Sequence, residues 1–358
     1  MLHNRKNTRI IKIDNVQIGG QNDVVIQSMT NTKTANIEAT LFQIEQLKKV
    51  GCQIVRIAVF DEEDAKALQT IVKNSVLPVI TDIHFNFEFA IKAIESGIKK
   101  IRLNPGNLED PVKLEKICTL ANQHNVAIRV GVNSGSIPKW ALDKYGYSSK
   151  SMIQTLKHYI KLLNKYKFHN IVISLKANDP IMMMEAYELA AKKFKYPLHL
   201  GVTEAGVLLD GTIKSTIGLT PLLLKGIGDT IRISLTDDPV KEIEVARKIL
   251  NALKIRNDLV DIISCPTCGR LNFNIMPLVE KVQEYTKDMF FPLKISILGC
   301  FVNGIGEGKE ADIGVAGSIQ KAVIFKHGKI LKTVSENQVF DELKILIDEE
   351  YNKYKLTK

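Results

Sequence analysis

The sequence predicts an α/β protein in which a (β/α)8 TIM barrel is followed by a smaller α+β domain. In about the first 250 of its 358 residues, eight short runs rich in Val or Ile alternate with amphipathic helical patterns. Strands that alternate with helices pair in parallel, and eight such units in this length are typical of a closed barrel. Past residue 257 the pattern changes to hairpin strands and two helices. We therefore predict a barrel domain over residues 1–257 and a second domain over residues 258–358.

The predicted barrel strands are too short for helices, and the helical patterns between them have recognisable ends. One such pattern opens at Asn36, continues through Leu41, Ile44 and Leu47, and stops at Gly51. A doubly wound open sheet is the alternative, although no Gly-x-Gly-x-x-Gly motif follows the first strand. We expect the eight strands at Val24–Gln27, Ile54–Val59, Pro78–Thr81, Lys100–Leu103, Ala127–Val130, Ile171–Leu175, Leu198–Val202 and Thr230–Leu235.

Polar and charged side chains follow the predicted strands at their carboxyl ends, where the catalytic groups of a TIM barrel lie. Five of the eight ends carry a cation, and cations that converge on one mouth repel one another unless an anion neutralises them. We therefore predict a phosphorylated ligand, with a diphosphate as the best match for several arginines. The residues at these ends are Ser28, Thr30, Arg56, Asp82, His84, Arg102, Asn104, Arg129, Asn133, Lys176, Thr203, Glu204, Arg232 and Ser234.

Three of these residues, Asp82, His84 and Glu204, could transfer protons in such a site. Each carboxylate could equally form ion pairs within the arginine cluster. The sequence leaves both roles open.

The second domain is predicted to be an α+β module of roughly 100 residues. Its hairpin turns at His327-Gly328, a pair suited to a tight two-residue turn. We expect strands at Val260–Ile263, Lys294–Leu298, Ala322–Lys326 and Lys329–Val334, with helices at Asn274–Thr286 and Glu336–Tyr354.

Three of the five cysteines, Cys265, Cys268 and Cys300, fall in loops of this second domain, with Glu307 close behind. The other two, Cys52 and Cys118, are expected in the core. A redox-active dithiol, a structural zinc site and three inert thiols are all possible interpretations. Three thiols with one position open favour an iron–sulfur cluster that binds a substrate.

Composition indicates a globular protein, with 45% hydrophobic and 25% charged residues. The net charge is +10, but lysines such as Lys92, Lys99, Lys100 and Lys113 are scattered, which favours a solvated basic surface over a nucleic-acid site. No run of 18 apolar residues and no apolar signal core are present, so we expect a cytoplasmic protein without a membrane partner.

The chain resembles the bacterial 4-hydroxy-3-methylbut-2-enyl diphosphate synthases of the methylerythritol phosphate pathway over nearly its whole length. The motifs that carry the resemblance are Gln27-Ser28-Met29-Thr30-Asn31-Thr32, Asp82-Ile83-His84-Phe85, Arg102-Leu103-Asn104-Pro105-Gly106-Asn107, Arg129-Val130-Gly131-Val132-Asn133-Ser134-Gly135, Leu200-Gly201-Val202-Thr203-Glu204-Ala205-Gly206, Ser264-Cys265-Pro266-Thr267-Cys268 and the stretch from Gly299-Cys300 to Glu307.

The resemblance implies an oxidoreductase that opens and dehydrates 2-C-methyl-D-erythritol 2,4-cyclodiphosphate. It implies a [4Fe-4S] cluster held by Cys265, Cys268, Cys300 and Glu307, with Glu307 as the exchangeable ligand, and flavodoxin or ferredoxin as electron donor. It also implies a head-to-tail homodimer. On this basis the catalytic residues are Glu307, Glu204, His84 and Asp82, and the substrate-binding residues are Arg56, Arg102, Arg129, Asn133, Lys176, Thr203, Arg232 and Ser234.

One residue departs from the family's usual pattern. Ile305 stands where a proline normally precedes the fourth cluster ligand, and loss of proline frees both a φ angle and a backbone N–H. A rival hypothesis from another class is a non-redox barrel transferase, acting on a pterin or phosphorylated substrate, with a structural zinc module. A redox-sensing binding protein is a further alternative, but it would not need a cation-lined mouth.

Overall fold

The computed structural model describes residues 5–83, 86–103, 110–271, 273–300, 310–318 and 321–357. The chain forms two compact units, Met1–Ile255 and Arg256–Lys358, and each has its own sheet and hydrophobic core. His84, Asn104, Ile305 and Glu307 lie outside the described residues, so what the sequence predicts for them stays a prediction.

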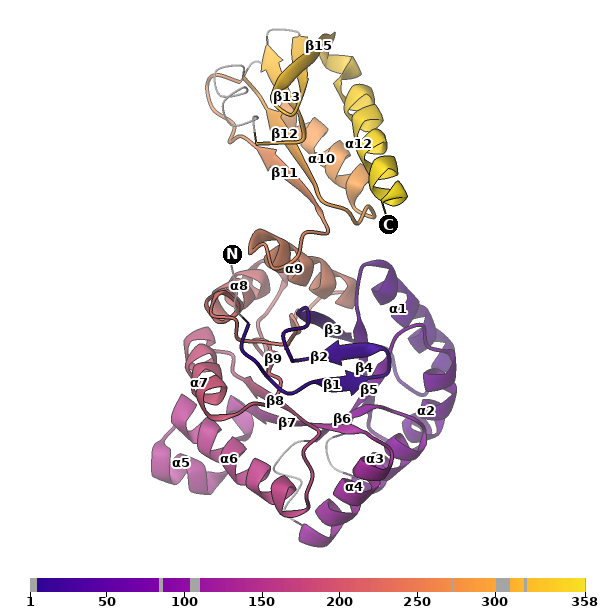
Figure 1. The fold of residues 1–358 in the computed structure, drawn as a ribbon, viewed down its shortest axis with the longest axis vertical. Helices are drawn as coiled ribbons and strands as arrows, with labels where there is room; N and C mark the ends of the chain where they lie inside the picture. The colour runs from indigo at the N-terminus through magenta and orange to yellow at the C-terminus, as the bar shows by residue number, and fades with distance from the viewer. Residues whose placement is uncertain are drawn as a thin grey trace. The chain divides into compact units, whose positions relative to one another are not determined.

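The first unit is the predicted parallel barrel (Figure 1). Its strands lie in the order β8-β7-β6-β5-β4-β3-β10-β9, and a parallel bridge between Ile173 and Leu198 joins the two edges. The closure leaves no long sheet edge exposed. The strands are β3 (Val25–Met29), β4 (Ile54–Val59), β5 (Val79–Ile83), β6 (Lys100–Leu103), β7 (Ala127–Asn133), β8 (Ile171–Lys176), β9 (His199–Leu200) and β10 (Thr230–Ile231).

Helices surround this barrel, and polar caps set where several of them begin. Asn36, Asp61 and Asp110 each accept a hydrogen bond from a backbone N–H of the first turn that follows. The helices are α1 (Ile37–Lys49), α2 (Glu62–Asn74), α3 (Phe87–Glu95), α4 (Pro111–Gln123), α5 (Lys139–Tyr145), α6 (Ser149–Lys165), α7 (Pro180–Lys193), α8 (Leu208–Leu224) and α9 (Pro239–Ala252), with a short 3-10 turn at Ser134–Ser136.

A hairpin that was not predicted from the sequence closes the end of the barrel where the strands begin. Strands β1 (Ile11–Ile13) and β2 (Val16–Ile18) pair antiparallel across a turn in which Asp14 has φ 51°. Their apolar side chains form one buried cluster with the first inward-facing residues of five barrel strands, namely Val25, Ile54, Ile80, Ala127 and Val172. The hairpin lies across this end of the barrel (Figure 1), and its apolar side chains pack against those of the strands.

The two faces of each barrel strand differ in chemistry. Ile57, Ile101 and Val130 belong to the core between strands and helices. Because side chains alternate along a strand, their neighbours on β4, β6 and β7 point into the barrel. These inward neighbours include Arg56 and Arg102, which meet the same carboxylate inside the barrel. The outward face of the strands is therefore apolar, whereas the interior toward their carboxyl ends carries charged side chains.

The second unit is the predicted α+β domain, with helices against one face of a five-stranded sheet. Strands β11, β12 and β13 are parallel, and β13, β14 and β15 are antiparallel. The predicted hairpin turn is confirmed, since His327 and Gly328 both have positive φ angles. The elements are β11 (Val260–Ser264), α10 (Ile275–Thr286), β12 (Leu293–Leu298), β13 (Ile313–Ser318), β14 (Lys321–Lys326), β15 (Lys329–Ser335), a 3-10 turn (Glu336–Gln338) and α12 (Val339–Leu356).

Among the described residues, none of the helices has the length and hydropathy needed to span a bilayer. Cys52 and Cys118 are buried, as predicted. Lys100 is not on the solvated surface where it was predicted to be, because its side chain is fully buried inside the barrel.

Candidate functional site

Strand β5 contributes a carboxylate that lies between two arginines. Asp82 Oδ2 lies 3.3 Å from Arg56 Nη1, and Asp82 Oδ1 lies 3.0 Å from Arg102 Nη1. All three side chains are less than a tenth exposed. Burial lowers the pKa of Arg56 to about 10, and the charge of Asp82 opposes that effect. In this geometry Asp82 holds the two guanidinium groups in place across neighbouring strands.

A second carboxylate reaches the barrel from outside. Glu242 on α9 is buried and pairs with Arg232, with the Arg232 Nη2 to Glu242 Oε1 distance at 3.3 Å. Its other oxygen accepts a hydrogen bond from Ser28 Oγ at 2.7 Å. Glu242 was not predicted as a site residue. It lies in the first turn of an amphipathic helix, where acidic residues are common, so nothing in the sequence distinguished it.

Two further cations, Arg129 and Lys176, form no ion pair with any carboxylate of the described residues. Arg129 is 2% exposed, and its Nε and Nη1 atoms have no hydrogen-bond partner there. Burial, together with the neighbouring cations, lowers the pKa of Arg129 and of Lys176 well below the usual values. Buried donors of this kind are ready to bind an anion, which would supply both the charge and the acceptors that the protein does not.

Glycines on two strands make room for these side chains. A Cβ atom on Gly201 would lie 2.8 Å from Lys176 Nζ and 2.5 Å from the carbonyl oxygen of Arg232. A Cβ atom on Gly131 would lie 2.9 Å from Ser174 Oγ and 3.3 Å from Arg102 Nε. Real Cβ atoms essentially never come within 3.0 Å of another atom, so a larger residue at either position would have to displace a neighbour, Lys176 or the Arg232 carbonyl at Gly201 and Ser174 at Gly131.

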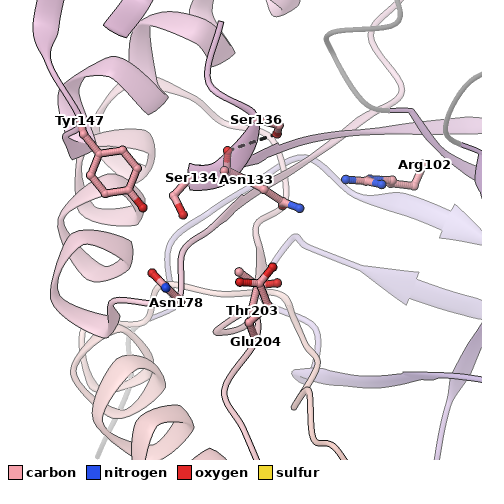
Figure 2. A pocket seen from close by; sticks show the side chains of 9 residues that line it. Arg102, Asn133, Ser134, Ser136, Tyr147, Asn178, Thr203 and Glu204 are labelled. Carbon is pink, nitrogen blue, oxygen red and sulfur yellow. Dashed lines mark hydrogen bonds between the residues drawn. The ribbon is translucent and has the colours of Figure 1, made fainter.

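The mouth of the barrel holds a pocket of about 310 Å³ (Figure 2). Four predicted residues line it, Arg102, Asn133, Thr203 and Glu204. The pocket lies beyond the carboxyl ends of β6, β7, β8 and β9, which is where a TIM barrel binds ligands. Five lining residues were not predicted as site residues, namely Ser134, Gly135, Ser136, Tyr147 and Asn178.

The loop after β7 reaches this pocket because a 3-10 turn follows the strand directly. Ser136 Oγ donates a hydrogen bond to the Asn133 carbonyl oxygen at 3.2 Å, drawn as a dashed line in Figure 2. Ser134 and Gly135 belong to a motif that carried the family resemblance, so that motif could have identified them. Tyr147 lies between two helices, and no motif marked it.

Glu204 has a strained backbone. Its φ angle is 52°, in the left-handed region that non-glycine residues seldom adopt. Gly206, two residues later, also has a positive φ of 105°. Such strain is concentrated at functional sites, where the surrounding structure holds it. Glu204 is exposed and lines the pocket beside Thr203 (Figure 2).

The structure therefore places the predicted residues in two groups. Arg56, Asp82, Arg129, Lys176 and Arg232 lie inside the barrel, while Arg102 reaches both the interior and the pocket. Asn133, Thr203 and Glu204 line the pocket above. Ser234 is half-buried just past β10, two residues after Arg232, and no described contact links its side chain to the other site residues.

A deeper polar layer of the barrel was not predicted from the sequence. Lys100 and His199 are both 0% exposed, although each lies on a short barrel strand. His199 Nδ1 lies 2.6 Å from Thr230 Oγ1, and the Tyr187 hydroxyl donates to the His199 carbonyl oxygen. Strict alternation along β6 and β9 turns both residues inward, and that is the signal that could have found them.

In the second unit, two predicted metal ligands follow neighbouring parallel strands. Ser264 on β11 pairs with Ile297 on β12, so the strand ends bring Cys265 close to Gly299-Cys300. The Gly299 N–H donates a hydrogen bond to Cys265 Sγ at 3.2 Å. A Cβ atom on Gly299 would lie 2.2 Å from a Leu271 methyl carbon, so this approach depends on glycine.

Cys268 lies on the exposed loop that follows Cys265. Hydrogen bonds from the Arg270 backbone and side chain lower the pKa of the Cys268 thiol, which favours the thiolate that a metal requires. Thiolates with backbone N–H donors to sulfur are a donor set that fits an iron–sulfur cluster. Within the described ranges, no three His, Cys, Asp or Glu side chains are arranged to hold a metal ion, and Glu307 lies outside those ranges.

Comparison with solved structures supports the fold of the first unit. A type I 3-dehydroquinate dehydratase from Clostridium difficile matches with a TM-score of 0.51 at 11% identity, covering 69% of this chain and 98% of that chain. At this identity the likeness concerns the fold alone.

Two sequence relatives match almost end to end. Both are named 4-hydroxy-3-methylbut-2-en-1-yl diphosphate synthase (flavodoxin). The protein from Mycoplasmoides gallisepticum is 55% identical over 354 residues, 99% of each chain. The protein from Malacoplasma penetrans is 55% identical over 350 residues, 98% of this chain and 97% of its own.

Two family models cover most of the sequence. The model described as the GcpE TIM-barrel domain matches residues 8–247, and the model described as the GcpE protein C-terminal domain matches residues 261–349. Both matches fall where the structure has its barrel and its α+β unit, and the chain belongs to the GcpE family.

Proposed function

We propose that the protein is an oxidoreductase that converts 2-C-methyl-D-erythritol 2,4-cyclodiphosphate to 4-hydroxy-3-methylbut-2-enyl diphosphate, with flavodoxin as electron donor. The names of the full-length relatives support this activity and do not favour the alternative transferase. The observation that carries the proposal is the excess of cations inside the barrel. Arg129 and Lys176 are buried with no counter-charge from the described residues, and a diphosphate would neutralise them.

In this proposal the barrel interior binds the diphosphate. Arg129 and Lys176 supply direct charge, while Arg56, Arg102 and Arg232 supply guanidinium groups already oriented by their carboxylate partners. Orientation before binding lowers the entropy lost when the ligand is held. The neutral side chains Asn133, Thr203 and Ser234 would donate hydrogen bonds to the remaining oxygens.

The reaction consumes two electrons and two protons. One ring C–O bond to phosphate breaks, a second C–O bond is lost with its oxygen as water, and a carbon–carbon double bond forms. Glu204 is the proposed proton donor among the described residues, because it lines the pocket and makes no ion pair in the described part of the chain. Asp82 is held between two arginines, so its proposed role is to position them. His84 is proposed as a second acid on sequence grounds.

The proposed cofactor is a [4Fe-4S] cluster held by Cys265, Cys268, Cys300 and Glu307. When bound, the cluster would pass electrons one at a time to the substrate. The protein's own contribution is the Gly299 N–H at Cys265 and the Arg270 groups at Cys268, which would stabilise negative charge on those sulfurs.

Turnover under anaerobic conditions tests the proposal. Protein purified without oxygen is supplied with reduced flavodoxin and the cyclodiphosphate, and the product is measured by mass spectrometry. Lys176→Met should lose substrate affinity while iron content stays the same, whereas Lys161→Met, an exposed lysine on α6, should match the wild type. An absence of product from wild-type protein with a full iron complement would refute the proposed activity.

The same protein preparation distinguishes the proposed iron–sulfur enzyme from the alternative, a transferase with a structural zinc module. A structural zinc module would give a colourless protein containing zinc, whereas an iron–sulfur protein is coloured by charge transfer from sulfur to iron. Metal analysis of the anaerobic protein decides between them.

We also propose that the enzyme is a homodimer. An exposed apolar stripe runs along α8, where Leu209, Ile213 and Ile217 are spaced four residues apart and are between 48% and 70% exposed. A stripe of this kind is unusual on a free helix face and suits a symmetric contact with a second copy. Ile213→Lys combined with Ile217→Lys should give a monomer in light scattering, with Ile345→Lys on α12 as the exposed control. A dimer in the double variant would contradict this interface.

A further inference from the structure

Lys100 lies deeper in the barrel than the proposed diphosphate ligands. It is on β6 two residues before Arg102, and its side chain is 0% exposed. Its Nζ atom lies 3.5 Å from Gln27 Oε1 on β3, and β3 and β6 are separated in the sheet by β4 and β5. The Lys100 side chain therefore crosses the barrel interior and lies under the site.

No carboxylate in the described part of the chain forms an ion pair with Lys100. A lysine buried without a counter-charge is costly for the folded protein, because the ammonium group loses its hydration and gains no partner charge. Its hydrogen-bond acceptor is the neutral amide of Gln27. Stability alone would favour an apolar residue at this position, and most of the inward residues at the hairpin end of the barrel are apolar.

Four groups in the barrel interior act on Lys100. Gln27 on β3 accepts its hydrogen bond, the charges of Arg56 on β4 and Arg129 on β7 oppose its protonation, and His199 on β9 is affected by its charge in turn. The buried carboxylates of this interior are engaged elsewhere, Asp82 with Arg56 and Arg102, and Glu242 with Arg232. Burial, followed by the charges of Arg129 and Arg56, lowers the pKa of Lys100 well below its usual value.

Several buried donors in this layer have no partner among the described residues. They include Gln27 Nε2 and Arg129 Nε, each on a side chain less than a tenth exposed. His199 Nε2, which donates or accepts according to the tautomer, also has no partner there. Since Gln27 Oε1 accepts from Lys100, the amide presents its Nε2 donor elsewhere in the interior. Lys100 thereby fixes which end of the amide can meet an acceptor.

We propose that Lys100 is a positioning residue for the anion: it orients the Gln27 amide, and it takes up a proton when an anion enters the barrel. The charge of Lys100 then appears when there is a negative charge to stabilise it. The inference rests on the proposed function only in taking the substrate diphosphate as that anion, and it holds for any comparable anion.

The direction of the pH dependence follows. An anion raises the pKa of a nearby amine, so binding draws in a proton at pH values between the pKa of the ligand-free enzyme and the higher pKa of the complex. Affinity is highest below the lower of these two pKa values and falls as the pH rises. Lys176 contributes in the same sense, so the difference between wild type and a Lys100 variant isolates the part that belongs to Lys100.

Calorimetric titration of the anaerobic holoenzyme, without reductant, measures this proton uptake. The cyclodiphosphate and inorganic pyrophosphate are titrated separately in two buffers of different ionisation enthalpy. Lys100→Met should take up about one proton fewer than wild type and bind roughly tenfold more weakly. Its ligand-free melting temperature should equal or exceed that of wild type, because an apolar side chain replaces an unpaired amine. If Lys100 were only structural, its replacement would not change the proton uptake, and it would not weaken binding while the melting temperature stays the same or rises.

Two further variants make the test specific. Lys99→Met removes a half-buried lysine one residue away and should leave proton uptake and affinity unchanged. Gln27→Glu gives Lys100 a permanent counter-charge, so Lys100 should stay protonated and the uptake should disappear although the lysine is present. If Lys100→Met does not fold, Gln27→Glu tests the same coupling.

Equal proton uptake in wild type, Lys100→Met and Gln27→Glu overturns the inference, and so does failure of both anions to bind the wild type. A third outcome separates the two proposals. If pyrophosphate binds with proton uptake that depends on Lys100 but the cyclodiphosphate does not bind, the inference about Lys100 is supported and the proposed substrate is wrong.

Discussion

Gly201→Ala tests whether the strand ends are packed as tightly around the cations as the structure indicates. The new methyl group would lie 2.5 Å from the Arg232 carbonyl oxygen and 2.8 Å from Lys176 Nζ. The lysine tip can move, but the carbonyl belongs to the next strand and cannot move without disturbing the barrel. Overpacking of this kind destabilises a protein by about 1–3 kcal/mol. For a unit of this size that corresponds to a fall in melting temperature of roughly 2–12 °C.

Displacement of Lys176 should also weaken binding of the cyclodiphosphate. Loss of one charge-assisted contact costs about 1.5–3 kcal/mol, or roughly one to two orders of magnitude in affinity. Thermal unfolding and titration calorimetry measure the two effects on the same sample. Gly131→Ala, which meets only side chains, should have a smaller effect on stability. Gly135→Ala is the matched control for stability, because no described atom lies within 4 Å of the place its methyl group would take. Unchanged melting temperature and affinity in Gly201→Ala would refute this account of the packing.

Three other variants or treatments test separate parts of the structure. Arg129→Met should weaken anion binding by about one to two orders of magnitude without lowering the iron content, because it removes buried donors that have no partner in the described part of the protein. Titration calorimetry and iron analysis check this, and an unaltered affinity would show that the ligand binds outside the barrel. Tyr187→Phe should lower the free energy of unfolding by about 1–3 kcal/mol, because the buried Leu175 N–H loses the acceptor that lies 2.9 Å away. Tyr145→Phe, at a half-buried position on α5, should leave the stability unchanged, and denaturant unfolding of both variants checks this. In cluster-free protein at mildly alkaline pH, an alkylating reagent should modify Cys268 first, because the pKa of its thiol is lowered. Cys52 and Cys118 should remain unmodified, because burial raises the pKa of their thiols to about 12. Early modification of Cys52 in the folded protein, detected by peptide mapping, would contradict this order.

The sequence was sufficient to predict the barrel because its outward face is apolar and periodic. Ile57 and Val130 stand in runs that only a strand buried against helices would require, and the structure confirms β4 and β7 there. Prediction was weaker where strands are short. The run Leu198–Val202 contains only the two-residue strand β9, which ends just before Gly201, where a Cβ atom would meet Lys176 and the Arg232 carbonyl oxygen.

Charged residues at strand ends were interpretable from the sequence, but charged residues within the strands were not. Lys100 follows another lysine and was assigned to the surface, although alternation with Ile101 turns it inward. A pair of adjacent lysines carries no sign of which one is buried. Glu242 was missed for a similar reason, since its contact with Arg232 joins residues on different elements, and only the fold brings them together.

The hairpin β1–β2 covers the end of the cation-lined interior that lies opposite the mouth. The described side chains at the end where the strands begin are apolar and buried, which makes the passage of ions unfavourable there. The field of the buried cations then acts on anions chiefly at the mouth, where low-dielectric walls concentrate it. Such a field speeds the arrival of a negatively charged substrate, and salt screens it over about 8 Å at physiological ionic strength. The hairpin, at the end of the barrel opposite the proposed site, thus helps determine how fast the substrate is captured.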